Sequence, residues 1–106
     1  MKMIYISHPY SGSPRENKAD ADGIRGYLKK EHPSICFVNP LGMFGDETTE
    51  YLVTLSDAME LLSHCDGMVY CEGWEDSVGC RAEIAFCKQQ GIKHKYIKDF
   101  IQDGGF

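Results

Sequence analysis

The sequence lacks any long hydrophobic run and any excess of basic residues. No stretch approaches the roughly 20 consecutive apolar residues that span a bilayer, so we expect no membrane partner. The first residues lead straight into a strand-like run rather than an export signal, which indicates a cytoplasmic protein. Asp and Glu outnumber Lys and Arg by 16 to 11, giving a formal net charge of −5. A nucleic acid polymer requires a basic surface, so we expect no such partner, whereas local geometry still permits a small anion.

Metal, redox and common nucleotide motifs are also missing. The five cysteines include no C-x-x-C pair and lie in apolar segments, which predicts reduced core thiols. They are Cys36, Cys65, Cys71, Cys80 and Cys87. The four histidines are scattered singly, so zinc-type ligand spacing does not occur. Because G-x-x-x-x-G-K-[ST] and G-x-G-x-x-G are absent, the sequence gives no support to a nucleoside triphosphatase or a dinucleotide enzyme. We therefore expect no metal and no cofactor.

What is present predicts one α/β domain over residues 1–106. Hydrophobic residues make up 42% and charged residues 25%, as in globular proteins, and the length suits a single core. Strands are expected at 3–6, 35–38, 67–71 and 93–97, and helices at 15–31, at 50–63 and from an N-cap at Ser77 to Gln90. The last strand leads into a tail. This alternation predicts a flavodoxin/Rossmann-like three-layer sandwich with a parallel sheet of about four to five strands.

Two loops are the expected ligand site. In a parallel sheet of this kind, ligands lie beyond the carboxyl ends of the strands, where the strand order reverses. The loops at 7–14 and 72–77 follow the first and third expected strands. A further loop at 41–49 contains glycines and fits either a lid or an interface strip.

The helix after Ser77 carries the best candidate for chemistry. Its free amide groups and its dipole face the expected crevice and favour an anion. Ser77 can hydrogen-bond a phosphate, and Gly79 leaves space one turn before Glu83 for a sugar to reach that carboxylate. A helical wheel places Glu83 at the margin of the core face, where an ordinary solvated glutamate also occurs. That core face comprises Val78, Ala82, Ala85 and Phe86. The pattern alone leaves a nucleophile and a surface residue as alternatives.

Other polar and aromatic residues could contact the same ligand. The candidates in the first loop are Ser7, His8, Tyr10, Ser11, Gly12 and Arg15. Trp74 can stack on a base or pack against a neighbouring subunit. Asp57, within the second helix, is either a second carboxylate facing the crevice or a solvated side chain. Asp66, at a helix-to-strand turn, is interpreted as structural.

Several segments of the chain follow one known pattern. They are Ile4 to Tyr10, Asn39-Pro40, Cys65-Asp66, Gly73-Trp74 and Ser77 to Glu83. Together they resemble the nucleoside 2-deoxyribosyltransferase-like superfamily over nearly the whole chain. The pattern G-W-x-x-S-x-G-C-x-x-E at 73–83 looks like the hallmark of its short, often phage-associated branch, whose function is unassigned.

The resemblance implies a catalytic set and an assembly. In it, Glu83 attacks the anomeric carbon of a deoxynucleoside and forms a glycosyl ester. Asp57 assists proton transfer at the base, and Tyr10 orients the nucleophile. Ser77 is similar to the serine with which 2′-deoxynucleoside 5′-monophosphate N-hydrolases hold phosphate, whereas transferases acting on free nucleosides usually carry aspartate. The resemblance also implies a homo-oligomer, a dimer or larger, in which a neighbour's residues complete each site.

Three functions remain open for a ligand that is a small-molecule nucleoside or nucleotide. The first is hydrolysis of the N-glycosidic bond of 2′-deoxynucleoside 5′-monophosphates through a covalent glycosyl-Glu83 intermediate. The second is exchange of bases between deoxynucleosides by a 2-deoxyribosyltransferase. The third is a non-catalytic module that binds or senses a nucleotide.

Overall fold

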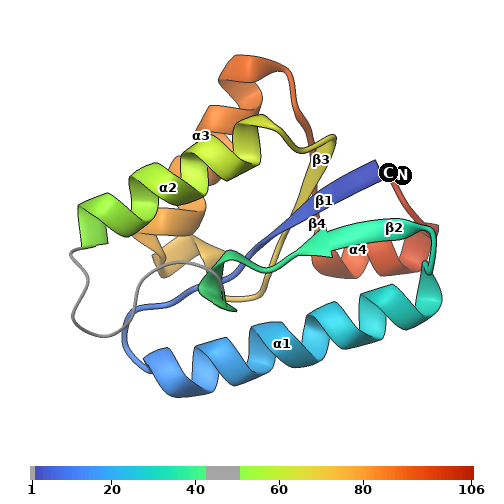
Figure 1. The fold of residues 1–106 in the computed structure, drawn as a ribbon, viewed down its shortest axis with the longest axis horizontal. Coiled ribbons are helices and arrows are strands. Elements are labelled where there is room, and N and C mark those ends of the chain that lie inside the picture. Colours follow the sequence, from blue (N-terminus) through green and yellow to red (C-terminus); the bar gives the residue numbers. More distant parts are fainter. Residues whose placement is uncertain (1, 43–50) are drawn as a thin grey trace.

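Four strands form one parallel sheet in the order β2-β1-β3-β4 in the computed structural model, which describes residues 2–42 and 51–106 (Figure 1). The strands are β1 (Lys2–Ser7), β2 (Ile35–Val38), β3 (Gly67–Tyr70) and β4 (Lys93–Tyr96). The helices are α1 (Pro14–Glu31), α2 (Tyr51–Ser63), α3 (Val78–Gln90) and α4 (Ile97–Asp103). Single 3₁₀ turns lie at Pro40–Gly42 and Trp74–Asp76. The predicted fold class is confirmed.

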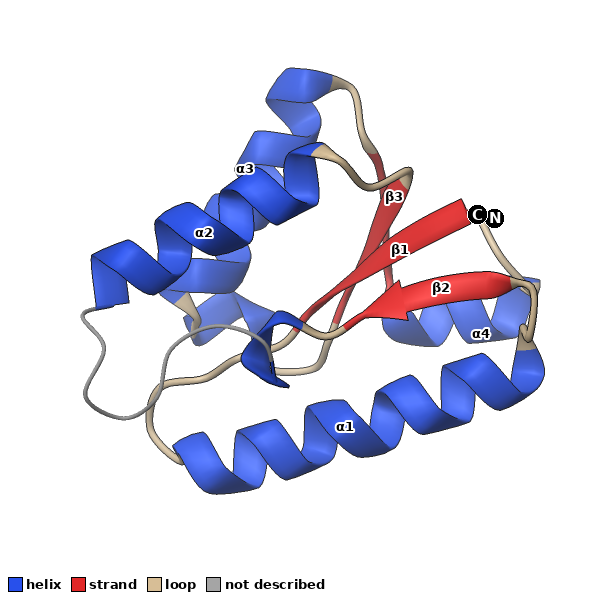
Figure 2. Ribbon diagram, viewed as in Figure 1, coloured by secondary structure: helices blue, strands red, loops and turns tan. Residues whose placement is uncertain are grey.

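Helices cover both faces of the sheet, giving three layers. Figure 2 shows α1 and α4 on one side of the strands and α2 and α3 on the other. Successive side chains of a strand point to opposite faces. Ile4 and Ile6 of β1 accordingly join the buried cluster with Leu28 and Phe100, while Tyr5 joins the cluster with Leu62 and Ile84. Hydrophobic burial on both faces of β1 and β3 holds the sheet between its helices.

The spacing of Ala21, Ile24 and Leu28 predicts an apolar stripe on α1, and the buried face of α1 follows it, but the buried face of α3 differs from the predicted one. Ala21 and Leu28 of α1 are buried. In α3 the predicted core residue Val78 is 61% exposed, and Ala85 is also exposed. The buried residues of α3 are Cys80, Glu83, Ile84 and Cys87. The helix therefore turns a stripe containing two cysteines to the sheet, and Glu83 lies within that stripe rather than at its margin.

A fourth helix replaces part of the expected tail. The sequence predicts a strand through Ile97 followed by irregular chain, whereas the strand ends at Tyr96 and α4 begins at Ile97. Ile97 and Phe100 are buried on one side of this seven-residue helix. The ring of Phe100 packs edge-on against Phe37, with 6.3 Å between centroids. Such a short helix depends on packing rather than on its own propensity, which is why its pattern is weak.

Other sequence-based expectations concern single residues and one loop. The Met3 amide donates to Oδ2 of Asp66 at 2.8 Å, which confirms the structural interpretation of Asp66. Cys65, Cys71, Cys80 and Cys87 are buried free thiols, and Cys36 is partly buried and also free. Most of the predicted 41–49 loop lies outside the described residues. No helix in the described ranges is both long and apolar enough for a bilayer span.

Candidate active site

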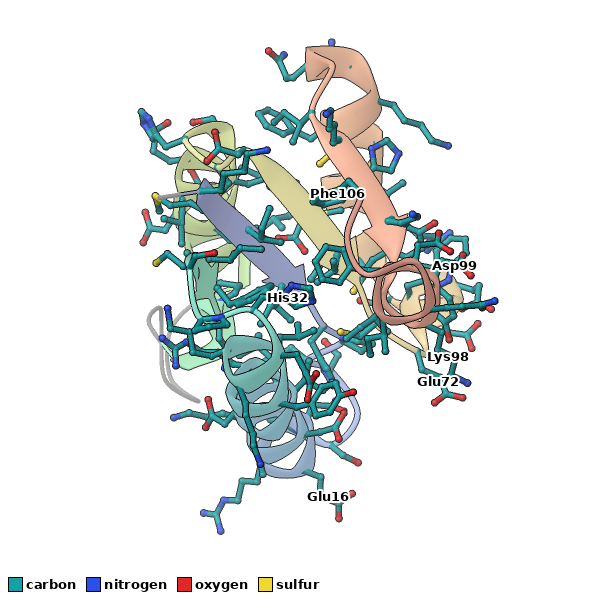
Figure 3. All side chains as sticks on the ribbon, turned by 90° about the vertical axis from the view of Figure 1, so that its right-hand side faces the viewer. Glu16, His32, Glu72, Lys98, Asp99 and Phe106 are labelled. Atoms are coloured by element: carbon teal, nitrogen blue, oxygen red, sulfur yellow. The ribbon has the colours of Figure 1, made fainter. Side chains whose placement is uncertain are left out.

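A cleft of about 820 Å³ opens where the loops after β1 and β3 diverge. The amide of Cys71 donates to the carbonyl oxygen of Ser7 at 2.9 Å, so these strand ends are joined directly below it. β1 pairs with β2 on one side and β3 on the other, so the strand order reverses here. Figure 3 shows Glu16 and Glu72, which line the cleft, at the end of the molecule toward which the strand arrows point. The cleft thus lies at the predicted position and has the volume of a small-molecule site.

Glu83 lies at the floor of this cleft and is held by two hydroxyl groups of β1. It lines the cleft although only 6% of it is exposed. The Tyr5 hydroxyl donates to Oε2, and the Ser7 hydroxyl donates to Oε1 at 2.9 Å. Both donors are themselves fully buried. They are two positions apart on one strand and therefore point to the same face, toward α3.

Burial changes the acid–base properties of this trio. Desolvation raises the pKa of the Glu83 carboxyl to about 7, against the lowering effect of the hydrogen bonds from Tyr5 and Ser7. Burial and the charge of Glu83 raise the pKa of Tyr5 well above its ordinary value, so its phenol stays protonated and continues to donate. Glu83 is therefore a carboxylate whose ionisation is balanced near neutral pH, as is common for catalytic groups.

The start of α3 has the predicted capping geometry. Ser77 is the N-cap, and its Oγ accepts a hydrogen bond from the Cys80 amide at 3.2 Å. Ser77, Val78 and Gly79 all line the cleft, so the amino end of the helix faces the space above Glu83. The helix dipole and amide groups there favour a negatively charged group.

The first loop contributes the opposite wall. Tyr10, Ser11 and Gly12 line the cleft, and Gly12 has a φ of 96°, in the left-handed region that favours glycine. The side chain of Asn17 donates to the Tyr10 carbonyl oxygen at 3.0 Å and ties this loop to α1. His8 also lines the cleft.

His8 is fixed by both of its ring nitrogens. Nε2 lies 2.6 Å from Oδ2 of Asp20, and Nδ1 lies 2.7 Å from the carbonyl oxygen of Pro9. Only 4% of the His8 side chain is exposed. The contact with Asp20 attaches the loop to α1, and the contact with Pro9 fixes the ring within the loop, so the ring helps to shape the wall of the cleft.

Four residues predicted for the site lie outside the cleft lining. Asp57 is exposed on α2, although its neighbours Leu55 and Ala58 do line the cleft. Arg15 is exposed at the start of α1. Trp74 packs edge-on against Tyr70, with 5.4 Å between ring centroids, and belongs to the core below α2 and α3. Ser7 is buried and contacts Glu83 rather than open space.

Tyr5 was not among the site residues predicted from the sequence, yet its hydroxyl donates to Glu83. The resemblance implies that Tyr10 orients Glu83, and in the structure Tyr10 lines the same cleft. One signal was available: a tyrosine in a short buried strand needs a hydrogen-bond partner for its hydroxyl. That strand also places Ser7 on the same face.

The charges around the cleft are predominantly negative. Its described lining includes the carboxylates of Glu16, Glu72, Asp76 and Glu83 and no lysine or arginine. By sequence, residues 43–54 also contain no Lys, Arg or His. In the described part of the chain, no group of three or more His, Cys, Asp or Glu side chains is arranged to hold a metal ion. The described lining offers carboxyl groups together with hydroxyl groups such as those of Tyr5, Tyr10 and Ser77.

The fold is similar to solved structures, and the sequence matches one protein family. No curated protein sequence matches the chain significantly. Among solved structures, a 2-desoxiribosyltransferase from Leishmania mexicana is similar with a TM-score of 0.68 and 17% identity, over 91% of this chain and 63% of that one. A conserved protein from Enterococcus faecalis V583 is similar with a TM-score of 0.70 and 18% identity, over 89% of this chain and 61% of that one.

The chain thus spans about three fifths of the length of each of these structures. The likeness shows that this chain shares the fold of a 2-desoxiribosyltransferase, as the resemblance predicts. Residues 2–96 match the family described as "Domain of unknown function (DUF4406)". This match covers most of the chain, and the chain belongs to the DUF4406 family.

Proposed function

We propose that this protein cleaves the N-glycosidic bond of 2′-deoxynucleoside 5′-monophosphates, with Glu83 as the nucleophile. The observation that carries the proposal is the arrangement of Glu83: a buried carboxylate on the floor of a cleft, held by two hydroxyls of β1. Burial of an unpaired charge is costly, so a glutamate without a special role is expected at the surface. The chain also shares its fold with a 2-desoxiribosyltransferase, a protein named for the transfer of deoxyribosyl groups.

The proposed reaction has two steps. An oxygen of Glu83 forms a bond to C1′ of the sugar as the bond from C1′ to the base nitrogen breaks, and the electron pair leaves with the base. The base takes up a proton on leaving. Water then attacks C1′ of the glycosyl ester, loses a proton and releases Glu83 as a carboxylate. The transition state has oxocarbenium character, which a nearby carboxylate stabilises.

The phosphate is assigned to the amino end of α3. Ser77, Ser11 and Gly12 line the cleft, and a phosphate near Ser77 would lie on the helix dipole. Tyr10, on the same wall, offers a ring and a hydroxyl to the sugar or the base.

The proton for the leaving base has two candidate donors. The resemblance offers Asp57, whose side chain is exposed outside the cleft lining. The structure suggests Asp76 as the other donor, because Asp76 lines the cleft and precedes Ser77 in the sequence. Both are carboxyl groups, and general acid catalysis of this kind contributes about 10²–10⁴-fold to a rate.

The charges of the cleft favour a second candidate, base exchange or hydrolysis on deoxynucleosides without a phosphate. A dianionic phosphate would meet the carboxylates of Glu16, Glu72 and Asp76 without a lysine or arginine in the described lining to compensate them. An uncharged nucleoside avoids this repulsion, and its amino groups could donate to those carboxylates.

One incubation experiment tests both candidates. The purified protein is incubated with each of the four 2′-deoxynucleoside 5′-monophosphates and each deoxynucleoside, with and without an added free base, and products are separated by chromatography. Released base with deoxyribose 5-phosphate supports the first candidate. A product that contains the added base supports transfer. Ligand-induced thermal stabilisation without product would indicate the non-catalytic binding module.

The role of Glu83 is tested with a matched pair of variants. Glu83→Gln keeps the size of the side chain and removes the nucleophile, so turnover should fall at least about 10³-fold. Glu60→Gln alters an exposed glutamate of α2 and should retain wild-type activity. Circular dichroism of both variants checks the fold. Turnover by Glu83→Gln at the wild-type rate would contradict the assignment.

A further inference from the structure

We propose that Ser7 is a positioning residue for Glu83: its hydroxyl fixes Oε1 of the carboxylate while Tyr5 fixes Oε2. The inference rests on the proposed role of Glu83 as nucleophile. Ser7 then orients the nucleophile and does not contact substrate. The burial and the hydrogen bonds of Ser7 support this assignment.

Ser7 is placed where it can reach Glu83 and cannot reach a ligand. It is fully buried and does not line the cleft. Its backbone pairs with Tyr70 in the parallel register of β1 and β3, and its carbonyl oxygen accepts from the Cys71 amide at 2.9 Å. The main chain of Ser7 is thus held in the sheet, and its Oγ lies 2.9 Å from Oε1 of Glu83.

The hydroxyl of Ser7 has two neighbours on α3. Besides Glu83, it lies beside the thiol of Cys80, whose pKa is raised by burial and lowered by hydrogen bonds with Ser7 and Ser77. An ionised carboxylate is a far stronger acceptor than a neutral thiol. The Ser7 proton is therefore directed to Glu83.

The groups that surround Glu83 leave Ser7 and Tyr5 as its stabilising partners. The titratable groups that share electrostatic interactions with Glu83 are Tyr5 of β1 and Cys80 and Cys87 of α3. Burial raises the pKa of each of them, so they are neutral near pH 7 and bring no compensating charge. From α2, Ala58 and Leu55 contribute apolar lining to the cleft. The ionised form of Glu83 is thus supported chiefly by two hydroxyl hydrogen bonds.

Removing one of the two donors should therefore change when Glu83 ionises. In Ser7→Ala, the carboxyl should titrate about one pH unit higher than in the wild type, because a hydrogen bond to a charged group is lost. Ser7→Cys preserves the size and a weak donor and should give a smaller shift. Ser63→Ala removes an exposed hydroxyl of α2 that donates to the Glu60 carbonyl oxygen, and should give no shift.

The titration is measured directly, without substrate. Protein carrying ¹³C-labelled glutamate carboxyls is titrated by NMR, and the Glu83 signal is assigned by its absence in Glu83→Gln. Where the protein turns over a substrate, the acid limb of the profile of kcat/KM against pH should move up by the same amount in Ser7→Ala. On that limb, kcat/KM of Ser7→Ala, relative to its own plateau, should be about tenfold lower than the same ratio in the wild type. A merely structural role of Ser7 would lower the plateau and leave the limb in place.

The outcomes separate this inference from the proposed function. A higher titration of Glu83 in Ser7→Ala, with an intermediate value in Ser7→Cys, supports the inference even if no tested nucleotide is cleaved. An unchanged Glu83 titration in a folded Ser7→Ala protein overturns it, whether or not the protein is active. Cleavage that survives in Glu83→Gln would contradict the proposed role of Glu83 as nucleophile, and the titration would still show whether Ser7 holds its carboxylate.

Discussion

The Tyr5 hydroxyl donates its hydrogen bond to Glu83 from 78 positions away in the sequence, across the interface between β1 and α3. This bond fixes Oε2 of the carboxylate from a ring that is fully buried. Tyr5→Phe removes the hydroxyl and retains the packing of the ring. Because a hydrogen bond to a charged group contributes about 1.5–3 kcal/mol, we expect kcat/KM at pH 7 to fall about tenfold to a hundredfold.

The control for that substitution is Tyr27→Phe on α1, where the ring is 48% exposed and away from the cleft lining. It should retain wild-type kinetics on the same substrate. A Tyr5→Phe enzyme as fast as the control at every pH would show that the hydroxyl has no part in the reaction.

The stability of the protein should depend on pH through Glu83. Its pKa rises from an ordinary value of 4.5 to about 7 in the folded state, chiefly because the carboxyl is buried. The folded state therefore binds this proton more tightly than the unfolded state. The contribution to stability is fully present below pH 4.5 and is lost as pH rises through about 7, at a cost of about 3 kcal/mol.

Urea unfolding of the wild type and Glu83→Gln across this pH range measures the effect. Glutamine is neutral at every pH. As pH rises from 4.5 to 7, the free energy of unfolding of the wild type should therefore fall relative to that of Glu83→Gln. Glu60→Gln, at an exposed site, serves as the control and should follow the wild type. Parallel curves for all three proteins would mean that Glu83 ionises normally.

Gly73 should be needed for both stability and activity. It has a φ of 90°, and an added Cβ would lie 3.3 Å from Cγ of Pro9, on the wall of the cleft. Gly73→Ala should lose about 1 kcal/mol of stability from the left-handed backbone and should also lower kcat/KM by displacing Pro9.

A matched glycine separates these two effects. Gly91, the C-cap of α3, has a φ of 71°, and nothing lies within 4 Å of an added Cβ. Gly91→Ala should therefore show a similar shift in melting temperature with unchanged kinetics. Equal loss of activity in both variants would indicate that stability alone accounts for the effect at Gly73.

The proton donor can be identified by comparing two aspartates. Asp76 lines the cleft and Asp57 does not, so Asp76→Asn should slow cleavage more than Asp57→Asn. Loss of a general acid costs about 10²–10⁴-fold, which is well above the effect of removing a remote exposed charge. Single-turnover release of the base, measured by rapid quench for each variant, provides the comparison. A loss of this size in Asp57→Asn alone would identify Asp57 as the acid and reverse our expectation.

The strands, α1 and the position of the cleft were predictable because each depends on a local pattern. Apolar β-prone runs mark β1, β2 and β3, and Ala21, Ile24 and Leu28 mark the inner side of α1. β4 reads Lys-His-Lys-Tyr, and its prediction depended on its place after the glycine that ends α3. The parallel order then places ligand-binding loops at one edge of the sheet. These inferences need no knowledge of which side chains meet across the fold.

The burial of Glu83 was not predictable in this way. A helical wheel ranks residues by their own hydrophobicity, and by that measure a glutamate belongs at the margin. Glu83 lies in the buried stripe because Tyr5 and Ser7 supply hydrogen bonds from another layer of the fold. The same long-range dependence explains why the hydrogen bond from Tyr5 to Glu83 was not predicted, and why α4, which depends on packing by Phe100, was missed.

Side chains alternate along β1, so odd-numbered and even-numbered positions of this strand have different roles. Tyr5 and Ser7 serve the carboxylate, while Ile4 and Ile6 fill the opposite layer. Insertion or deletion of one residue between Met3 and Ser7 would exchange the two sets, placing isoleucines beneath the cleft and hydroxyls among the rings of Phe37 and Phe100. Substitutions within each set can therefore preserve the strand, but a change in its length by a single residue would remove both the hydroxyl groups that hold Glu83 and one hydrophobic layer.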